Sequence, residues 1–502
     1  MNNLILLLPE IILFLFAFVI LSLDMVWQRD DSKQNTLGYL TLAACLLATV
    51  AAIWVLLQGN LAVIATDAQG QEPMMAADHF AFFFKIYASL TALLVALISE
   101  DYIRARIRFR GEFYALMLLA AMSLMLVAGS VNLVMIFLAF EFLSIVSYIL
   151  TGYMRQDEKS IEGAVKYFIY GAAASSVMLF GFSLLYGASG ALDLNGIAQG
   201  LATSTTGTIS LLILPALVLV IVGLGFKIAL VPFHQWAPEA YQGAPTPITA
   251  FLSVGPKAAG LALMARVLII GFPAAWNSWV ILLTGIAILT MTFGNLVALW
   301  QRDMKRLFAY SSIAQAGYML IGVVAIAPQI LSGAATQTWN EGLNGMLYYL
   351  LAYLFTNLGA FAVIIAVENQ TGSTQISAYA GLFRRAPFLA IAMLVFFLSL
   401  VGIPPTAGFV GKFVVLGAAI NQEMYFLAIV AIINSVISLY YYFFVVRQMF
   451  FADGEETTPL SVSMPVMATV AVTTALVLLM AIWAQPFIRW TTDSAQILAT
   501  SF

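Results

Sequence analysis

The chain has 502 residues, of which 62% are hydrophobic and 9% are charged, with a formal net charge of −3. This number of charged side chains is too small to cover the surface of a water-soluble globule of this length. The composition therefore excludes a soluble enzyme and indicates an integral membrane protein. We expect no nucleic-acid partner.

Apolar windows of roughly 20 residues, long enough for a helix to cross about 30 Å of hydrocarbon, recur along the whole chain. The runs are continuous and do not alternate as in an outer-membrane barrel. They predict an all-α polytopic membrane protein with about fourteen transmembrane helices. The first window, within residues 1–28, contains no Lys or Arg and is longer than the apolar part of a signal peptide, so we expect it to be the first span.

Basic residues gather in alternate predicted loops, and short loops rich in Lys and Arg face the cytoplasm. This pattern predicts a multi-pass membrane protein with both termini on the outer side. Among the opposite loops we expect only Arg266 and Arg489, near span ends. The residues of the predicted cytoplasmic loops are Arg29, Lys33, Arg104, Arg106, Arg108, Arg110, Arg155, Lys159, Arg302, Lys305, Arg306, Arg384, Arg385 and Arg447.

Glu141 is the single carboxylate in NLVMIFLAFEFLSIVSYILTG, residues 132–152. It follows Asn132 by about nine residues, which places it roughly 13 Å deep, near the middle of the bilayer. An ionised side chain there is costly, so we expect it to face the bundle interior, to be protonated or to have a cationic partner. The alternative is an ion pair that only holds two helices together.

Lys227 lies in VGLGFKIALVPFHQW, shortly before Pro232. Proline cannot donate a backbone hydrogen bond, so we expect the helix to break just beyond the lysine, next to protein or a water-filled cavity that satisfies the freed groups. His234 follows this break, where an imidazole could pass protons near neutral pH. A kink that only improves packing, and a hydrogen bond at a helix end, are the structural alternatives.

A proline that precedes or follows a lysine within an apolar segment occurs twice more along the chain. In FLSVGPKAAG, Pro256 predicts a break immediately before Lys257. The apolar segment 387–420 is too long for one straight span of roughly 20 residues, and Pro404 and Pro405 interrupt it before Lys412.

Broken helices around Lys227 and Lys412 suggest two halves of similar construction. We expect three N-terminal helices in residues 1–100, five-helix repeats in 112–270 and 277–450, and a last span in 464–486. An odd number of helices in each repeat makes the two repeats inverted relative to each other.

Three further lysines are less informative. Lys166 lies near the start of its span and could reach the cytoplasmic surface. We expect Lys85 to have a structural role beside Asp78, and Lys305, in RDMKRL, to be a cytoplasmic charge that fixes the orientation, although it lies close to the next span.

The sequence also excludes a resident redox or nucleotide site. One Cys and two His cannot hold an iron–sulfur cluster and are too sparse for two bis-histidine haems. GFVGKF, residues 408–413, departs from the phosphate-binding loop pattern in spacing and in its final Phe413. Any electrons or nucleotide are therefore expected in other subunits.

Buried Glu and Lys residues instead suit the movement of protons. Burial disfavours the charged form of a lysine and a nearby carboxylate favours it, so a change in that carboxylate switches the lysine between binding and releasing a proton. Polar side chains in the spans could order water between such sites. They are Ser175, Ser253, Tyr310, Ser311, Ser312, Gln315, Thr356 and Asn357.

Several consecutive motifs carry a resemblance to a known family. FLAFEFLSIVSYILTGY, EGAVKYFIYGAAASS, FKIALVPFHQWAPEAYQGAPTPITAFLSVGPKAAG, QRDMKRLFAYSSIAQAGYML and LVGIPPTAGFVGKF resemble the antiporter-like membrane subunits of respiratory complex I, most closely the N subunits of bacterial NADH:quinone oxidoreductases. The similarity is strongest from about residue 80 to 450.

The resemblance implies fourteen helices with discontinuous seventh and twelfth spans, and a proton path through Glu141, Lys227, Lys257 and Lys412. Lys166 and His234 also match family positions that look functional. It implies no cofactor in this chain, with NADH, FMN, iron–sulfur clusters and quinone in partner subunits. The expected partners are the M-type, K-type and J-type membrane neighbours and the redox arm.

The sequence leaves three functions open. The first is a proton-translocating subunit of a quinone-reducing complex. The second is a subunit of an Mrp-type cation/proton antiporter, which shares the fold and the lysine pattern, although PFHQWAPEAYQGAP favours the first. The third is a scaffold without pumping activity, whose buried charges have no function.

Overall fold

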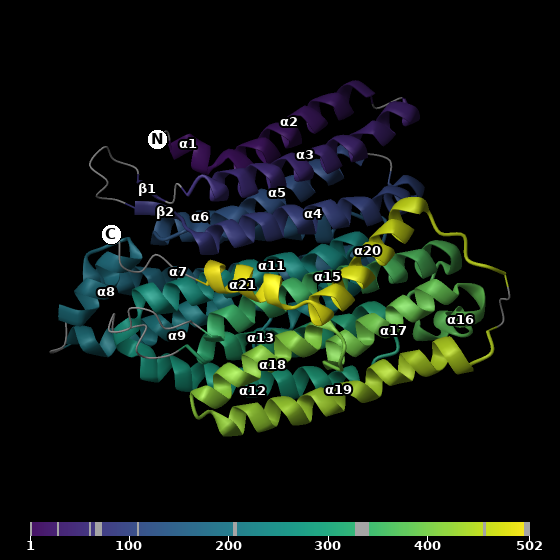
Figure 1. Ribbon diagram of the computed structural model, residues 1–502. Helices are drawn as coiled ribbons and strands as arrows, with labels where there is room; N and C mark the ends of the chain where they lie inside the picture. The colour runs from purple at the N-terminus through teal and green to yellow at the C-terminus, as the bar shows by residue number, and fades with distance from the viewer. Residues whose placement is uncertain are drawn as a thin grey trace.

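The computed structural model describes residues 3–27, 30–59, 62–65, 73–107, 110–203, 208–326, 341–454 and 458–495. These residues form a bundle of long helices that lie side by side, with one short β-hairpin (Figure 1). The N-terminal part comprises α1 (Asn3–Leu6), α2 (Leu8–Trp27), α3 (Asp31–Leu57), β1 (Ala62–Ala65), β2 (Pro73–Ala77) and α4 (His79–Arg106). The antiparallel pair β1–β2 was not expected from the sequence.

The next helices correspond to the first predicted repeat. They are α5 (Arg110–Gly129), α6 (Leu133–Thr151), α7 (Glu158–Ser189), α8 (Leu194–Thr203), α9 (Thr208–Ile228), α10 (Trp236–Gly243) and α11 (Thr246–Arg266). The last of these continues into the π-helix η1 (Val267–Gly271), and the 3-10 turn η2 (Pro273–Ala275) follows.

The second predicted repeat and the C-terminal part complete the bundle. They comprise α12 (Trp276–Ala298), α13 (Met304–Val324), α15 (Glu341–Thr371), η3 (Ile376–Tyr379), α16 (Leu382–Arg385), α17 (Pro387–Val401), α18 (Ala407–Asn421), α19 (Tyr425–Phe451), α20 (Met464–Ile482) and α21 (Gln485–Ser494).

Twelve helices among the described residues are long and apolar enough to cross a membrane. Three shorter apolar segments lie in α9, α17 and α18. They form two further pairs of helices, α9 with the short α10 and α17 with α18. Counting each pair as one interrupted crossing accounts for the roughly fourteen spans that the sequence predicts.

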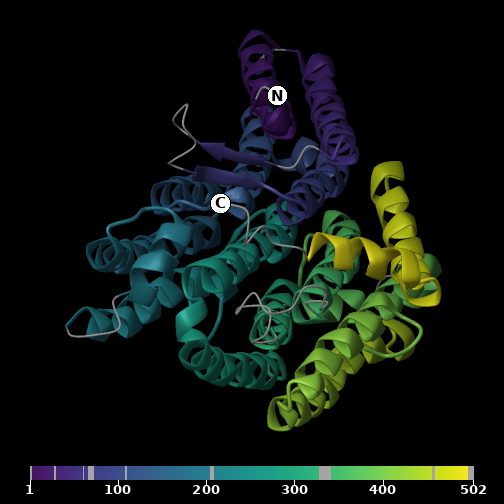
Figure 2. The same ribbon diagram turned by 60° about the vertical axis from the view of Figure 1, so that its left-hand side comes forward.

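The centre of the bundle is formed by α11, α13 and α15, whose most apolar windows are 100%, 94% and 100% buried. The helices α2 and α3 lie along one edge, whereas α12 and α19 lie along the opposite edge (Figures 1 and 2). The three central helices therefore carry their polar side chains in the part of the molecule furthest from lipid.

Two of the three predicted helix breaks are confirmed. The helix α9 ends at Ile228, one residue after Lys227, and α10 begins only at Trp236. Backbone groups freed at this break find partners: Trp236 Nε1 donates to the Phe226 carbonyl, 2.8 Å away, and the Val231 amide donates to Thr290 Oγ1, 3.0 Å away. The second break separates α17 from α18 around Pro404 and Pro405 and leaves Lys412 in the second half.

The predicted break at Pro256 is wrong, because α11 continues through this proline without interruption. Proline leaves the Leu252 carbonyl without its helical donor. The Tyr241 hydroxyl donates to this carbonyl over 3.3 Å, so a side chain from α10 satisfies the freed group and the helix continues.

Candidate functional site

Glu141 lies on α6 and is hydrogen-bonded to a side chain of α7. The hydroxyl of Ser175, on α7, donates to Glu141 Oε1. Ser144, one turn further along α6, accepts a hydrogen bond from Lys227 Nζ over 2.9 Å. The carboxylate is also close enough to Lys227 for their charges to interact. The structure therefore brings together Glu141 and Lys227, as the sequence predicts, with serines on both sides.

The position of Glu141 differs from expectation in one respect. It is only partly buried, and it follows the stripe of α6 that contains Leu138, Ile145 and Ile149, which are 58%, 50% and 48% exposed. Of the three alternatives considered for Glu141, a position facing the bundle interior is met only in part, while the nearby Lys227 supplies a cation. Sequence hydropathy gives the depth of a residue in the membrane, but it does not show which side of an almost uniformly apolar helix faces outwards.

Lys227 is fully buried in the last turn of α9. Besides the bond to Ser144, its ammonium lies 5.2 Å from the centre of the Phe140 ring, which can stabilise a cation. A cation in the last turn also complements the negative end of the helix dipole. The break in the helix thus places the lysine where its positive charge is partly compensated.

Lys257 is 2% exposed and lies directly after Pro256 in α11. Its Nζ donates to Ser312 Oγ over 2.7 Å, and Ser312 Oγ donates to the Tyr241 hydroxyl over 3.2 Å. The ammonium also lies 5.8 Å from the centre of the Tyr241 ring. Of the polar side chains predicted in the spans, Ser175 and Ser312 thus contact the ionisable residues directly.

Lys412 is 6% exposed and bridges the second helix break. Its Nζ donates to the carbonyl of Val401, the last residue of α17, and to Ser435 Oγ, each over 2.9 Å. The ammonium lies 4.1 Å from the centre of the Tyr318 ring. As at α9, a lysine lies at the negative end of a half-helix.

His234 lies in the connection between α9 and α10 and is 8% exposed. Its ring packs edge-to-face against Phe293 with 4.5 Å between ring centres. Among the described residues its Nδ1 atom has no hydrogen-bond partner, and the ring is close enough to Lys257 for their charges to interact. The helix-end hydrogen bond considered from the sequence is therefore not formed by Nδ1.

The structure does not bring Lys166 into this buried set. Lys166 forms an ion pair of 2.6 Å with Glu162 on the surface of α7, and the two side chains are 42% and 61% exposed. Its place in a proton path stays a prediction.

Two other lysines differ from expectation. Lys85 is buried, but its partner is Glu10 on α2, at 2.8 Å, and not Asp78. Lys305 is 5% exposed and donates over 2.6 Å to the carbonyl of Ala244, at the end of α10, so it is not simply a loop charge.

Sequence reasoning missed the buried pair of Arg266 and Asp78. Arg266 Nη1 and Nη2 each donate to one carboxylate oxygen of Asp78 over 2.9 Å, and its Nε donates to the carbonyl of Ala128 over 3.0 Å. Arg266 is therefore a fully buried link between helices and not an outer-loop charge. A single basic residue near a span end gives no sequence signal that separates these two situations.

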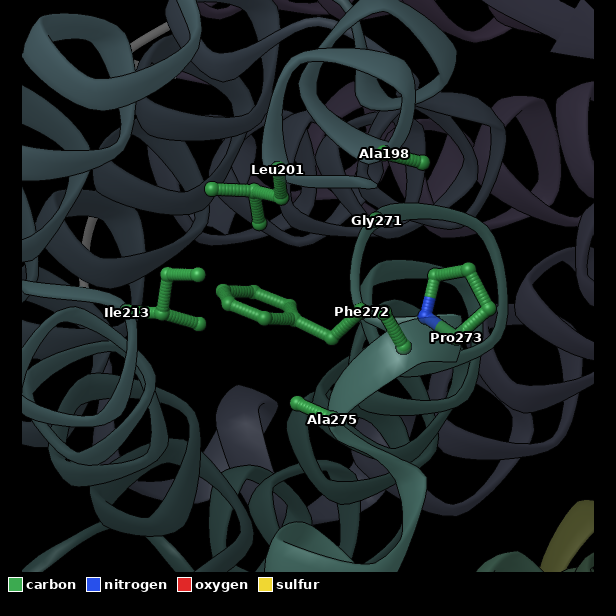
Figure 3. Close-up of a pocket in the computed structure, with 8 residues that line it drawn as sticks. Ala198, Leu201, Ile213, Gly271, Phe272, Pro273 and Ala275 are labelled. Carbon is green, nitrogen blue, oxygen red and sulfur yellow. The ribbon is translucent and has the colours of Figure 1, made fainter. Parts of the chain in front are cut away.

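Within the described residues, no group of three or more His, Cys, Asp or Glu could hold a metal ion. An apolar pocket lies between α8, η1 and η2, where Leu201, Ile213, Phe272 and Pro273 line it (Figure 3). Its lining contains no titratable side chain, so the pocket is separate from the lysine site.

Comparisons with known proteins agree with this arrangement. Residues 130–438 match the family described as NADH:quinone oxidoreductase/Mrp antiporter, TM. NADH-quinone oxidoreductase subunit N 2 from Symbiobacterium thermophilum is 40% identical over 505 residues, which cover 98% of this chain and 96% of the relative.

Solved structures share the fold. A chain of respiratory complex I from Thermus thermophilus is 31% identical with a TM-score of 0.77, over 97% of this chain and 99% of that one. A chain of the Mrp complex from Dietzia sp. is 22% identical with a TM-score of 0.81, over 98% and 97%. The chain therefore belongs to the NADH:quinone oxidoreductase/Mrp antiporter membrane family, in the branch of the N subunits.

Proposed function

We propose that this chain translocates protons as a membrane-arm subunit of a respiratory NADH:quinone oxidoreductase, driven by quinone reduction in neighbouring subunits. One observation carries the proposal. Lys227, Lys257 and Lys412 are buried in helices of a membrane protein, and among the described residues each binds a hydroxyl group and none forms an ion pair.

A buried ammonium without a counter-ion is costly in a membrane, and it contributes less to stability than an apolar side chain of similar size. A lysine that can lose its proton avoids this cost. Because a proton can leave the lysine nitrogen and return to it, three such lysines provide alternating charged and neutral sites for proton movement.

Glu141 supplies the charge that acts on the first lysine. An ionised carboxylate near a lysine favours the ammonium in general, so a change that neutralises or displaces Glu141 would release a proton from Lys227. Protons then move between Glu141, Lys227, Lys257 and Lys412. His234, whose ring is close enough to Lys257 for their charges to interact, is a further member of the proposed path, and Lys166 is the expected contact with the cytoplasmic surface.

The remaining features follow from membership of a larger complex. NADH, FMN, iron–sulfur clusters and quinone belong to partner subunits, since this chain has too few cysteines and histidines for redox centres. The membrane is the bacterial inner membrane, with both termini on the outer side. The M-type, K-type and J-type subunits are the proposed neighbours.

The two predicted repeats, residues 112–270 and 277–450, also belong to this proposal. In support, the interrupted crossing is the fourth of five in each group: α9 with α10 follows α5, α6 and α7, and α17 with α18 follows α12, α13 and α15. Inverted repeats with broken helices near the middle of the membrane are a common design of transporters.

An Mrp-type cation/proton antiporter subunit is the second candidate function. The Mrp chain shares the fold, but at 22% identity it supports nothing further. The 40% identity with a subunit N relative over nearly the whole chain favours the first candidate.

The function can be tested with Lys257→Met in the intact complex, in inverted membrane vesicles. The methionine keeps the length of the side chain but cannot carry a proton, so we expect the ratio of protons pumped to NADH oxidised to fall. Lys33→Met is the control, since Lys33 is an exposed lysine paired with Asp30. An unchanged ratio in Lys257→Met would favour the scaffold without pumping activity.

A further inference from the structure

Two groups of buried hydroxyls lie between Lys257 and Lys412. The first comprises Ser312, which binds Lys257, and its neighbour in the chain, Ser311, whose hydroxyl is hydrogen-bonded to that of Tyr442. The ring of Tyr442 lies 4.4 Å from that of Tyr441. These side chains come from α13 and α19, and all of them are 2% exposed or less.

The second group belongs to Lys412. Ser435 accepts a hydrogen bond from Lys412 Nζ over 2.9 Å, and Ser435 Oγ donates to the Tyr318 hydroxyl over 3.4 Å. The Tyr318 ring also lies under the Lys412 ammonium. Each lysine thus has its own set of serine and tyrosine hydroxyls.

The two groups meet at Asn295, a fully buried amide in the apolar helix α12. The Tyr441 hydroxyl donates to Asn295 Oδ1 over 2.9 Å. On the opposite side, Asn295 Nδ2 donates to the Tyr318 hydroxyl over 3.4 Å and to Asn434 Oδ1 over 3.2 Å.

The neighbours of Asn295 fix the direction in which it points. Asn434 Nδ2 donates to the carbonyl of Val430 over 3.0 Å, and a backbone carbonyl can only accept. Asn434 must therefore turn its own Oδ1 towards Asn295, which obliges Asn295 to present Nδ2 there. Asn295 Oδ1 then faces Tyr441.

This orientation matters for proton movement. A hydroxyl accepts one proton and gives up another at the same oxygen, so a row of hydroxyls can pass a proton along. A carboxamide would have to accept a proton at Oδ1 and lose one from Nδ2, which leaves the unfavourable imidic acid form. Asn295 thus joins the two groups by hydrogen bonds and blocks the passage of a proton through its own side chain.

We propose that Asn295 is a positioning residue that insulates Lys257 from Lys412. It holds Tyr441 and Tyr318 in place and keeps a proton on one lysine from reaching the other through these hydroxyls. This inference rests on the proposed function, because it concerns the same row of lysines.

The test replaces the amide with a group that can pass protons. In Asn295→Asp, one carboxyl group of nearly the same shape can accept a proton at one oxygen and release it from the other. In inverted vesicles containing the whole complex, we expect unchanged quinone reduction, fewer protons pumped per NADH and a several-fold faster decay of an imposed pH difference without NADH.

Two variants serve as controls. Asn434→Asp places the same carboxyl group next to Asn295 but not between the two tyrosines, and we expect a leak equal to that of the original chain. Asn295→Leu removes the hydrogen bonds and offers no proton carrier, so its leak also stays low. A leak in Asn295→Asp no faster than in both controls would overturn the inference.

Two further measurements complete the test. If Asn295→Asp does not assemble, Asn295→Ser offers an uncharged hydroxyl, and a leak equal to that of Asn295→Leu would count against insulation. Lys257→Met in the same vesicles separates the two proposals. If Lys257→Met lowers pumping while Asn295→Asp changes nothing, the inference about Asn295 is wrong but the proposed function stands. If Lys257→Met pumps normally, the proposed function is wrong.

Discussion

At the scale of single residues, the buried charges fall into two kinds. Lys85 and Arg266 each have a carboxylate partner, Glu10 and Asp78, and these pairs connect helices that are distant in the sequence. Lys227, Lys257 and Lys412 bind hydroxyls and backbone groups instead. Paired charges hold helices in place, whereas lysines without a carboxylate bond can change their protonation state, so the second kind forms the proposed site.

The pair of Arg266 and Asp78 gives a prediction about stability. Arg266→Ala would remove the guanidinium that binds the buried Asp78 carboxylate, and breaking a buried ion pair costs about 3–5 kcal/mol. We therefore expect a clearly lower thermal unfolding temperature of the detergent-solubilised complex, or failure of this subunit to assemble.

Arg384→Ala is the matched control, because Arg384 also binds an aspartate, Asp453, at 2.9 Å, but both side chains are more than 70% exposed, at 76% and 84%. Exposed ion pairs contribute little to stability. Equal unfolding temperatures for the two variants would show that the buried pair is not a structural link.

At the scale of helices, close backbone contacts between the half-helices hold the lysines in position. In α18, Gly408 lies so near to α17 that a Cβ atom would come within 1.9 Å of the Ser399 carbonyl oxygen. The Gly408 amide also donates to Ser399 Oγ over 3.1 Å. This contact holds the two halves of the broken span together and keeps Lys412 next to Val401.

We expect Gly408→Ala to push α18 away from α17, and hence to reduce both the stability of the subunit and the number of protons pumped per NADH. Gly417→Ala, in the same helix, is the control, since a Cβ atom there would meet no atom within 4 Å. Alanine at that position favours the helix by up to about 1 kcal/mol. Normal pumping and stability in Gly408→Ala would contradict the role given to this contact.

At the scale of the whole molecule, the incomplete burial of Glu141 points to a neighbour. A carboxylate near the middle of a membrane helix, on a stripe with the exposed Leu138 and Ile145, is costly against lipid. A second membrane subunit on α6 and α7 would exclude lipid from this position.

The prediction is that mild solubilisation and pull-down of this chain recovers membrane subunits together with flavin- and iron–sulfur-containing subunits, identified by mass spectrometry. Leu138→Cys, labelled with a photoreactive cross-linker, should join the chain to one of the membrane subunits. Recovery of only cofactor-free hydrophobic subunits, with sodium-driven activity and no electron donor, would support the antiporter.

Much of the architecture could be predicted from the sequence because it depends on local chemistry. The length of apolar runs predicts the spans, and the prolines next to Lys227 and Lys412 predict the two breaks, since a missing backbone donor acts within one helical turn. Pro256 has the same local chemistry, yet α11 stays continuous, because Tyr241 from another helix supplies the missing donor.

The sequence by itself therefore determined the membrane class, the number of crossings, two of the breaks and the identity of the buried ionisable residues. Only the tertiary structure decided which charges are paired, that Glu141 is only partly buried and that Asn295 stands between the hydroxyls of Lys257 and Lys412. The physical reason is that hydropathy measures the free-energy cost of moving a residue out of water, and this cost depends on the residue itself. The choice of partner depends on how helices far apart in the chain pack together, and an almost uniformly apolar sequence leaves that packing undetermined.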